Sequence, residues 1–124
     1  MVEPTIVNVV QNYLVVLCRT RLHVSRAVVF GSHARGEAQY ESDVDILVIA
    51  PEFDEPYNPS RVDLLWLARA QTDSRIEPVG VGERQWREDP ASLLVEMARR
   101  EGQEIPLPVA DIDLTGFNNY LCQQ

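Results

Sequence analysis

The stretch FGSHARGEAQYESDVDILV, residues 30–48, decides the fold. It leaves one apolar run at Gly31-Ser32, crosses a polar loop, and enters a second apolar run that carries two aspartates. Short apolar runs bounded by turn residues predict buried strands, here over 26–30 and 44–50. The loop between them is expected to hold turns and one helical turn after Ser32.

The two aspartates, Asp43 and Asp45, lie at the leading edge of the second apolar run. Because side chains alternate faces along a strand, both are predicted to point the same way, roughly 7 Å apart at their Cα atoms. At an effective dielectric near 20, two like charges at that distance repel by about 2 kcal/mol. A divalent cation between them would reverse the sign, and hard cations such as Mg²⁺ prefer carboxylate oxygens.

Gly31-Ser32 supplies groups of the opposite kind. A glycine at a strand end allows close approach of a ligand, and free N–H groups at the start of a helical turn favour phosphate. The Ser32 hydroxyl adds a donor; the alternative is that it only caps the turn, and the two roles are compatible. The stretch therefore offers donors for a phosphate and carboxylates for its metal, as phosphoryl and nucleotidyl transfer require.

The rest of the chain alternates helices with strands. Helices are predicted over 5–22, 59–70 and 91–101, a third strand over 75–81, and a helical turn over 83–87, whereas 51–59 is loop. This order predicts one domain over 1–105 in which helices cover a sheet. The tail, 106–124, matches no element.

Composition excludes several classes of protein. The 124 residues suit one domain, and a formal net charge of −8 argues against direct binding of nucleic acid through a basic face. No signal peptide or membrane span is evident. The two cysteines, Cys18 and Cys122, have no framework spacing, and we expect both to be thiols in a reducing cytoplasm.

A third carboxylate, Glu77, lies inside the third predicted strand. It would neighbour the aspartate pair if that strand lies beside the second one. Its role would then be that of general base toward an acceptor hydroxyl, or of ligand to a second metal. The alternative is an exposed residue of an edge strand, which the adjacent Pro78 favours.

Gly-Ser, ten further residues and Asp-x-Asp before an apolar strand resemble the signature of the nucleotidyltransferase superfamily. The shortness of the chain, IEPVGV and SLLVEMARREGQEI resemble its minimal nucleotidyltransferase subgroup, whose members pair with HEPN-domain ribonuclease toxins. The likeness covers roughly 5–105. It implies an α+β nucleotidyltransferase fold, a small mixed sheet flanked by helices.

The resemblance also implies an activity. Asp43, Asp45 and Glu77 would be catalytic and would bind Mg²⁺, in two ions, while Gly31 and Ser32 would hold the triphosphate. AMP from ATP would pass to a tyrosine of the partner HEPN toxin, so that the chain is a protein adenylyltransferase acting as an antitoxin. The oligomeric state stays open between a homo-oligomer and a hetero-oligomer with the toxin.

Arg35 could reach a phosphate or hold the loop through carbonyls, and it is counted among the phosphate-binding candidates. His33 stands where the family often has arginine, and we expect it to be an exposed loop residue rather than a base. Asp73 is a weaker candidate for the third carboxylate. Trp66 and Trp86 are expected to be packing residues. Asp111 and Asp113 are expected to be a chance match to Asp-x-Asp.

Two other functions fit the sequence. The chain could neutralise its partner without catalysis, by masking it, with the apolar tail as contact surface. It could also act on a small molecule such as an aminoglycoside, although no second domain is evident to hold that acceptor.

Overall fold

The computed structural model describes residues 1–39, 41–88 and 92–108. Its elements, in chain order, are α1 (Pro4–Leu17), β1 (Arg26–Phe30), α2 (Ser32–Arg35), β2 (Val44–Ile49), the 3₁₀ helix η1 (Pro51–Asp54), α3 (Pro59–Ala70), β3 (Ile76–Val81), α4 (Glu83–Glu88), α5 (Leu93–Glu101) and β4 (Gln103–Glu104). The expected α+β domain, a small mixed sheet flanked by helices, is confirmed.

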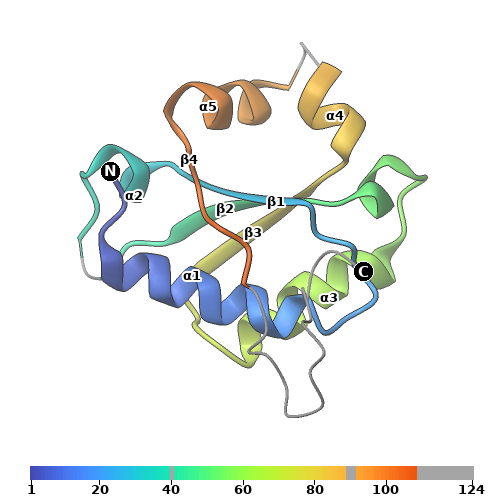
Figure 1. Cartoon of the computed structure of the whole chain (residues 1–124), viewed down its shortest axis with the longest axis horizontal. Coiled ribbons are helices and arrows are strands. Elements are labelled where there is room, and N and C mark those ends of the chain that lie inside the picture. The colour runs from blue at the N-terminus through green and yellow to red at the C-terminus, as the bar shows by residue number, and fades with distance from the viewer. Residues whose placement is uncertain (40, 89–91, 109–124) are drawn as a thin grey trace, which may run out of the picture.

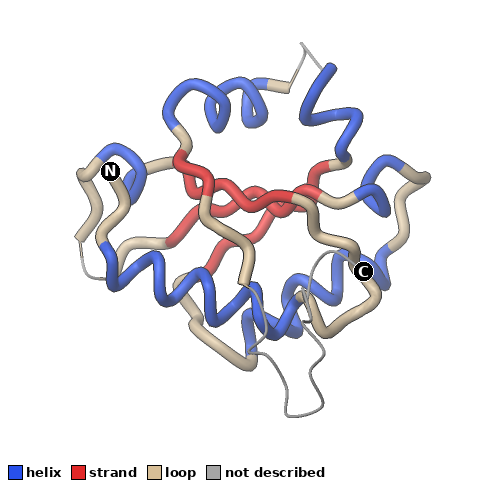
Figure 2. Tube along the Cα trace, in the orientation of Figure 1, coloured by secondary structure: helices blue, strands red, loops and turns tan. Residues whose placement is uncertain are grey.

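The four strands form one sheet in the order β3-β2-β1-β4. β1 pairs antiparallel with both β2 and β4, whereas β2 and β3 are parallel. A parallel pair needs a crossover, which α3 provides. Helices α1 and α3 cover one face of the sheet, and α4 and α5 cover the other (Figure 1). The strands thus form a central layer between two helical layers, as Figure 2 shows.

The pleat of β2 divides the core between these layers. Val44, Ile46 and Val48 belong to the larger cluster, which includes the buried residues of α1 and α3. Leu47 and Ile49 belong to the smaller cluster, which includes the buried residues of α5. Because side chains alternate faces, the odd-numbered Asp45 lies on the α5 face of the sheet.

Helix α1 is shorter than predicted. It was expected to continue to residue 22, but it ends at Leu17. The Thr20 hydroxyl donates to the Leu17 carbonyl at 2.5 Å and accepts from the Leu22 N–H at 3.3 Å. These local bonds replace the next helical turn and lead the chain toward β1. The short strand β4 was also not predicted, because two residues carry no periodic signal.

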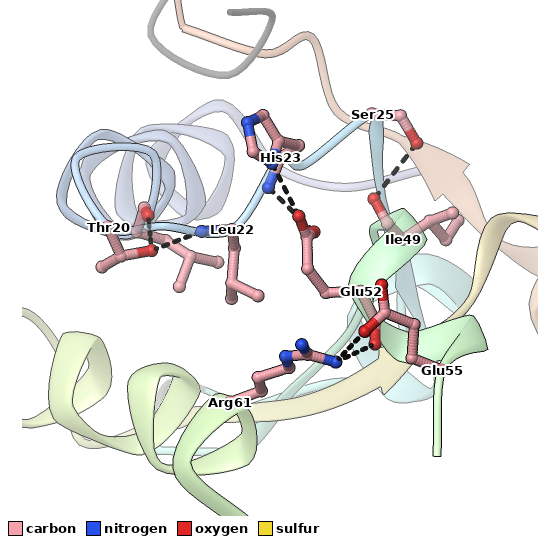
Figure 3. Close-up of polar contacts among 9 residues, drawn as sticks. Thr20, Leu22, His23, Ser25, Ile49, Glu52, Glu55 and Arg61 are labelled. Carbon is pink, nitrogen blue, oxygen red and sulfur yellow. Dashed lines mark hydrogen bonds and ion pairs between the residues drawn. The ribbon is translucent and has the colours of Figure 1, made fainter. Parts of the chain in front are cut away.

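Polar contacts hold the start of β1 to η1 and α3 (Figure 3). His23 Nδ1 lies 2.6 Å from a carboxylate oxygen of Glu52, and the His23 N–H donates to the other oxygen. Arg61 donates to the Glu52 carbonyl at 3.1 Å and pairs with Glu55 at 2.7 Å. Burial alone would raise the pKa of Glu52, but the bonds from His23 outweigh it and hold that pKa below its usual value.

Two predictions concern the environment of the protein. Cys18 is disulfide-bonded in the structure, so the expectation of a thiol there is wrong, and Cys122 lies outside the described residues. Spacing could not reveal this, because a disulfide depends on which distant segments meet. None of the helices in the described part of the chain has the length and hydropathy needed to cross a bilayer.

Candidate active site

Gly31 links β1 to α2 through a backbone conformation that glycine alone adopts easily. Its φ is 75° and its ψ is −152°. A Cβ atom here would overlap a carboxylate oxygen of Asp45, so the glycine lets that carboxylate pack against the backbone. The Gly31 carbonyl accepts the N–H groups of Ala34 and Arg35, both at 3.1 Å. Gly31, not Ser32, is therefore the N-cap of α2, and Ser32 is its first residue.

The strand register assembles the carboxylates. Asp45 is paired with Phe30 on β1 and with Glu77 on β3. The third predicted strand, β3, lies beside β2, which was the condition for Glu77 to neighbour the aspartate pair. β3 is also an edge strand, as Pro78 suggested. Asp43 precedes β2 by one residue rather than lying inside a strand.

Electrostatics at Asp45 match the predicted repulsion. Burial raises the pKa of its carboxyl group, and the negative charges of Asp43 and Glu77 raise it further. His33 and Arg35 act in the opposite direction but do not cancel the increase. A half-buried carboxylate between two like charges is a place where a cation would be stabilised.

An open cleft of about 590 Å³ joins these groups on the α5 side of the sheet. Its floor comes from β1, β2 and β3, and its walls come from α2, α3 and α5. The lining residues are Phe30, Gly31, Ser32, Arg35, Asp45, Trp66, Glu77, Pro78, Val79, Leu94 and Met97. Five of the six predicted site residues thus line one cleft, whereas Asp43, two residues before Asp45 in the sequence, is not among the lining residues.

The sequence model of the nucleotidyltransferase domain matches residues 12–89, which include all six of those site residues. The chain belongs to the nucleotidyltransferase domain family. No curated protein matches the chain in sequence.

Solved structures share the fold of this nucleotidyltransferase domain. A toxin-antitoxin crystal structure with AMP-PNP is 25% identical, with a TM-score of 0.55 over 79% of this chain and 73% of that one. A Sulfolobus solfataricus protein described as a nucleotidyltransferase is 14% identical, with a TM-score of 0.60 over 81% and 78%. The toxin-antitoxin MntA-HpeT is 19% identical over 87% of this chain and 75% of that one, with a lower TM-score of 0.49.

Two arginines of the nucleotidyltransferase domain flank the carboxylates. Arg35, on the β1 side, pairs with Glu37 at 3.0 Å and with Glu101 at 2.9 Å, and the bond to Glu37 is the main reason that its pKa is raised. The pair with Glu101 ties α2 to the end of α5. The two alternatives considered for Arg35 were a phosphate and loop carbonyls, but its partners here are carboxylates.

Arg69, on the β3 side, was not among the predicted site residues. Its guanidinium lies 3.9 Å from the Glu77 carboxylate and 5.2 Å from the centre of the Trp66 ring. The prediction that Trp66 is a packing residue is wrong, because its side chain is 40% exposed, belongs to neither core cluster and lines the cleft. The one available signal was the spacing of the two residues, since positions i and i+3 share a helix face.

Other candidates do not enter the cleft. His33 is buried rather than exposed, and its Nε2 lies 3.2 Å from the Ser42 carbonyl, which holds the loop before Asp43 onto α2. The Asp73 carboxylate accepts hydrogen bonds from the side chain and the backbone N–H of Arg75, and chiefly because of the side-chain bonds its pKa is lowered. Trp86 packs in the smaller core cluster between Arg26 and Arg99, as expected of packing. Asp111 and Asp113 lie outside the described residues.

The carboxylates suit a magnesium site that substrate completes. Among the described residues, no group of three or more His, Cys, Asp and Glu side chains forms a ready metal cage. Mg²⁺ is usually held by one or two carboxylates together with substrate phosphates, so a complete protein cage is not required. The donors at Asp45 and its neighbours are all oxygens, and Gly31 leaves space for that carboxylate beside the expected phosphate position.

Proposed function

We propose that this nucleotidyltransferase domain transfers AMP from ATP to a hydroxyl group, the acceptor being a tyrosine of a partner HEPN ribonuclease toxin. In that role the chain is an antitoxin and a protein adenylyltransferase. The observation that carries the proposal is the convergence of Gly31, Ser32, Asp45 and Glu77 in one cleft from three separate segments. The similar toxin-antitoxin crystal structure with AMP-PNP, an ATP analogue, supports both the nucleotide and the kind of partner.

Each residue has a defined task in the proposal. The N–H groups at the start of α2 and the Ser32 hydroxyl would bind the triphosphate. Asp43, Asp45 and Glu77 would hold two Mg²⁺ ions, which when bound would neutralise charge on the phosphates. Arg35 stands on the same side as Ser32 and would add positive charge near the leaving group.

The chemical step is a substitution at the α-phosphorus of ATP. The acceptor oxygen forms a bond to phosphorus, and the bond from phosphorus to the oxygen bridging to the β-phosphate breaks, which releases pyrophosphate. The acceptor proton passes to the Glu77 carboxylate in its role of general base, and from there to solvent. The products are the AMP ester of the acceptor and pyrophosphate.

The proposal also covers domain boundaries and location. We assign 1–105 to the catalytic domain and leave 106–124 as a separate tail with no assigned role. A cytoplasmic location is part of the proposal. Thiol titration of the protein purified from its native cells tests that part directly.

Calorimetric titration with a non-hydrolysable ATP analogue tests the catalytic site. We expect binding by the wild type in Mg²⁺, none in EDTA, and none by Asp43→Asn/Asp45→Asn. Asp63→Asn, on the exposed side of α3, removes the charge of a residue that does not line the cleft and should bind normally. Binding that survives EDTA and the double substitution would refute the proposed site.

A second experiment separates catalysis from masking. We expect Asp45→Asn to bind the partner toxin normally but to transfer no labelled AMP and to leave the toxin active. If that variant neutralises the toxin as well as the wild type does, the chain acts by covering its partner and the catalytic proposal fails.

A further inference from the structure

The cleft has two chemically different ends. In the sheet, Asp45 stands between its register partners, Phe30 on β1 and Glu77 on β3. The β1 end leads to Gly31, Ser32 and Arg35, which are polar and suited to phosphate. The β3 end borders α3, which lies beside the edge strand (Figure 1).

The β3 end presents an aromatic ring. Trp66, on α3, is 40% exposed and lines the cleft together with Glu77 and Pro78. Met97, on α5, is 38% exposed and lines the same cleft. This end therefore offers aromatic and thioether surface beside a carboxylate, unlike the phosphate-binding groups at Gly31 and Ser32.

Arg69 holds the ring and Glu77 in one arrangement. Its Nη2 donates to the Ser74 carbonyl at 2.6 Å, which anchors the guanidinium at the end of α3. From that anchor the guanidinium covers the Trp66 ring at 5.2 Å and faces Glu77 at 3.9 Å. At 3.9 Å it makes no hydrogen bond to Glu77, so the carboxylate keeps its oxygens for another group.

The geometry of the substitution reaction indicates which reacting group lies at each end of the cleft. The attacking and leaving oxygens lie roughly in line across the phosphorus. Neighbouring strands are about 4.8 Å apart, so β1 and β3 are separated by roughly 10 Å across β2. With the leaving pyrophosphate at Gly31 and Ser32, the attacking hydroxyl must approach from the β3 end, beside Glu77.

We propose that Trp66, oriented by Arg69, is the acceptor subsite, and that it binds the aromatic ring of a tyrosine side chain presented by a polypeptide. The inference rests on the proposed function, because that reaction sets the direction of attack. Aromatic rings pack in offset or edge-to-face arrangements, and such a contact would bring the phenol oxygen toward Glu77. An aliphatic hydroxyl gains nothing from the ring, so Trp66 would select an aromatic acceptor.

The two tryptophans provide an internal control. Trp86 is also flanked by arginines, Arg26 at 6.0 Å and Arg99 at 5.4 Å, but it does not line the cleft. Each tryptophan contributes one indole N–H signal to a ¹H–¹⁵N spectrum, and Trp86→Phe assigns the pair. The probe is N-acetyl-tyrosinamide, titrated to about 50 mM because a single ring contact gives weak affinity.

The Trp66 indole signal should shift with saturation, while the Trp86 signal should stay in place. N-acetyl-serinamide should shift neither signal. If both indoles shift equally, if the serine compound has the same effect, or if Trp66 does not respond at the highest concentration, the subsite is refuted. This experiment needs no ATP and no transfer, so it can fail or succeed independently of the proposed function.

Kinetics with Mg-ATP and a tyrosine peptide complete the test. We expect Trp66→Ala to raise the KM for the peptide about fivefold, with the KM for ATP unchanged, and Trp66→Phe to restore most of the loss. If transfer occurs and Trp66→Ala leaves the KM for the peptide unchanged, the subsite is wrong while the proposed function stands. If neither form transfers AMP although the Trp66 indole responds, the catalytic proposal fails and the binding site remains.

Discussion

Asp45→Asn should stabilise the folded protein while removing its proposed activity. The Asp45 carboxylate is half-buried against Gly31 and lies between the negative charges of Asp43 and Glu77. Asparagine has nearly the same shape but no charge, so the substitution removes repulsion and leaves packing unchanged. A residue that costs stability and is kept at a cleft is the pattern expected of a functional site.

The magnitude follows from the strand geometry. Two unit charges about 6 Å apart repel by about 0.7 kcal/mol in bulk water and by about 1.4 kcal/mol at an effective dielectric of 40. Glu77 is the direct cross-strand partner of Asp45, and Asp43 is two residues away. The opposing charges of His33 and Arg35 reduce the summed repulsion, so the free energy of unfolding of the variant should rise by about 1–2 kcal/mol at low ionic strength, or roughly 4–8 °C in Tm.

The effect should depend on pH in a defined direction. The pKa of Asp45 is raised in the folded protein above its ordinary value of 3.8, so the folded state binds this proton at a higher pH than the unfolded chain. The destabilisation is therefore full at pH 7 and disappears as the pH falls through the raised pKa toward 3.8. The advantage of Asp45→Asn should vanish below about pH 4.

Thermal unfolding followed by circular dichroism measures these effects. Wild type and Asp45→Asn are compared in EDTA at pH 7 and pH 4, and again at pH 7 with Mg²⁺ and a non-hydrolysable ATP analogue. We expect Mg²⁺ and the analogue together to raise the Tm of the wild type by mass action and to leave the variant unchanged. Asp63→Asn, exposed on α3, should change the unfolding free energy by less than about 0.5 kcal/mol. A lower Tm for Asp45→Asn in EDTA, or an equal gain at pH 4 and pH 7, would show that charge repulsion does not control the stability at this position.

Three further predictions concern the fold around the site. Gly31→Ala should lower the free energy of unfolding by about 1–3 kcal/mol and disturb nucleotide binding, because the backbone is strained there and the new Cβ would overlap the Asp45 carboxylate. Gly36→Ala, at a φ of 74° in open space, should lower it by only about 1–2 kcal/mol and bind nucleotide normally. Equal losses of stability and of binding in the two variants would contradict this. Tyr13→Phe should lower the free energy of urea unfolding by about 1 kcal/mol, because the fully buried hydroxyl donates to an α3 carbonyl at 3.0 Å, and an unchanged value would show that the bond contributes nothing. Glu52→Gln should cost less than about 1 kcal/mol at pH 7, and that cost should disappear as the pH falls through its lowered pKa; a cost that persists at pH 2 would assign the effect to packing.

Local patterns in the sequence carried most of the fold. Strands β1 and β2, helix α3 and the turn at Gly31 follow from apolar runs and glycine positions, because such signals act over a few residues. The spacing of Asp43 and Asp45 predicted a common strand face, but Asp43 precedes β2 by one residue, so strand alternation does not fix the direction of its side chain. The length of α1 did not follow, because one threonine side chain ended the helix.

The tertiary structure decided which distant residues meet. Glu77 is adjacent to Asp45 only because β3 pairs parallel with β2 at the sheet edge, and strand pairing depends on packing across the whole domain. Arg35 pairs with Glu101, 66 residues away, because the fold brings the end of α5 beside α2. Its sequence context had suggested a phosphate or loop carbonyls instead. The sequence alone therefore predicted Gly31, Asp43 and Asp45 as site candidates, because the motif that they form lies in one short segment. Only the packing of α3 against the sheet placed Trp66 and Arg69 beside them, because contacts between separate elements leave no periodic trace in the chain.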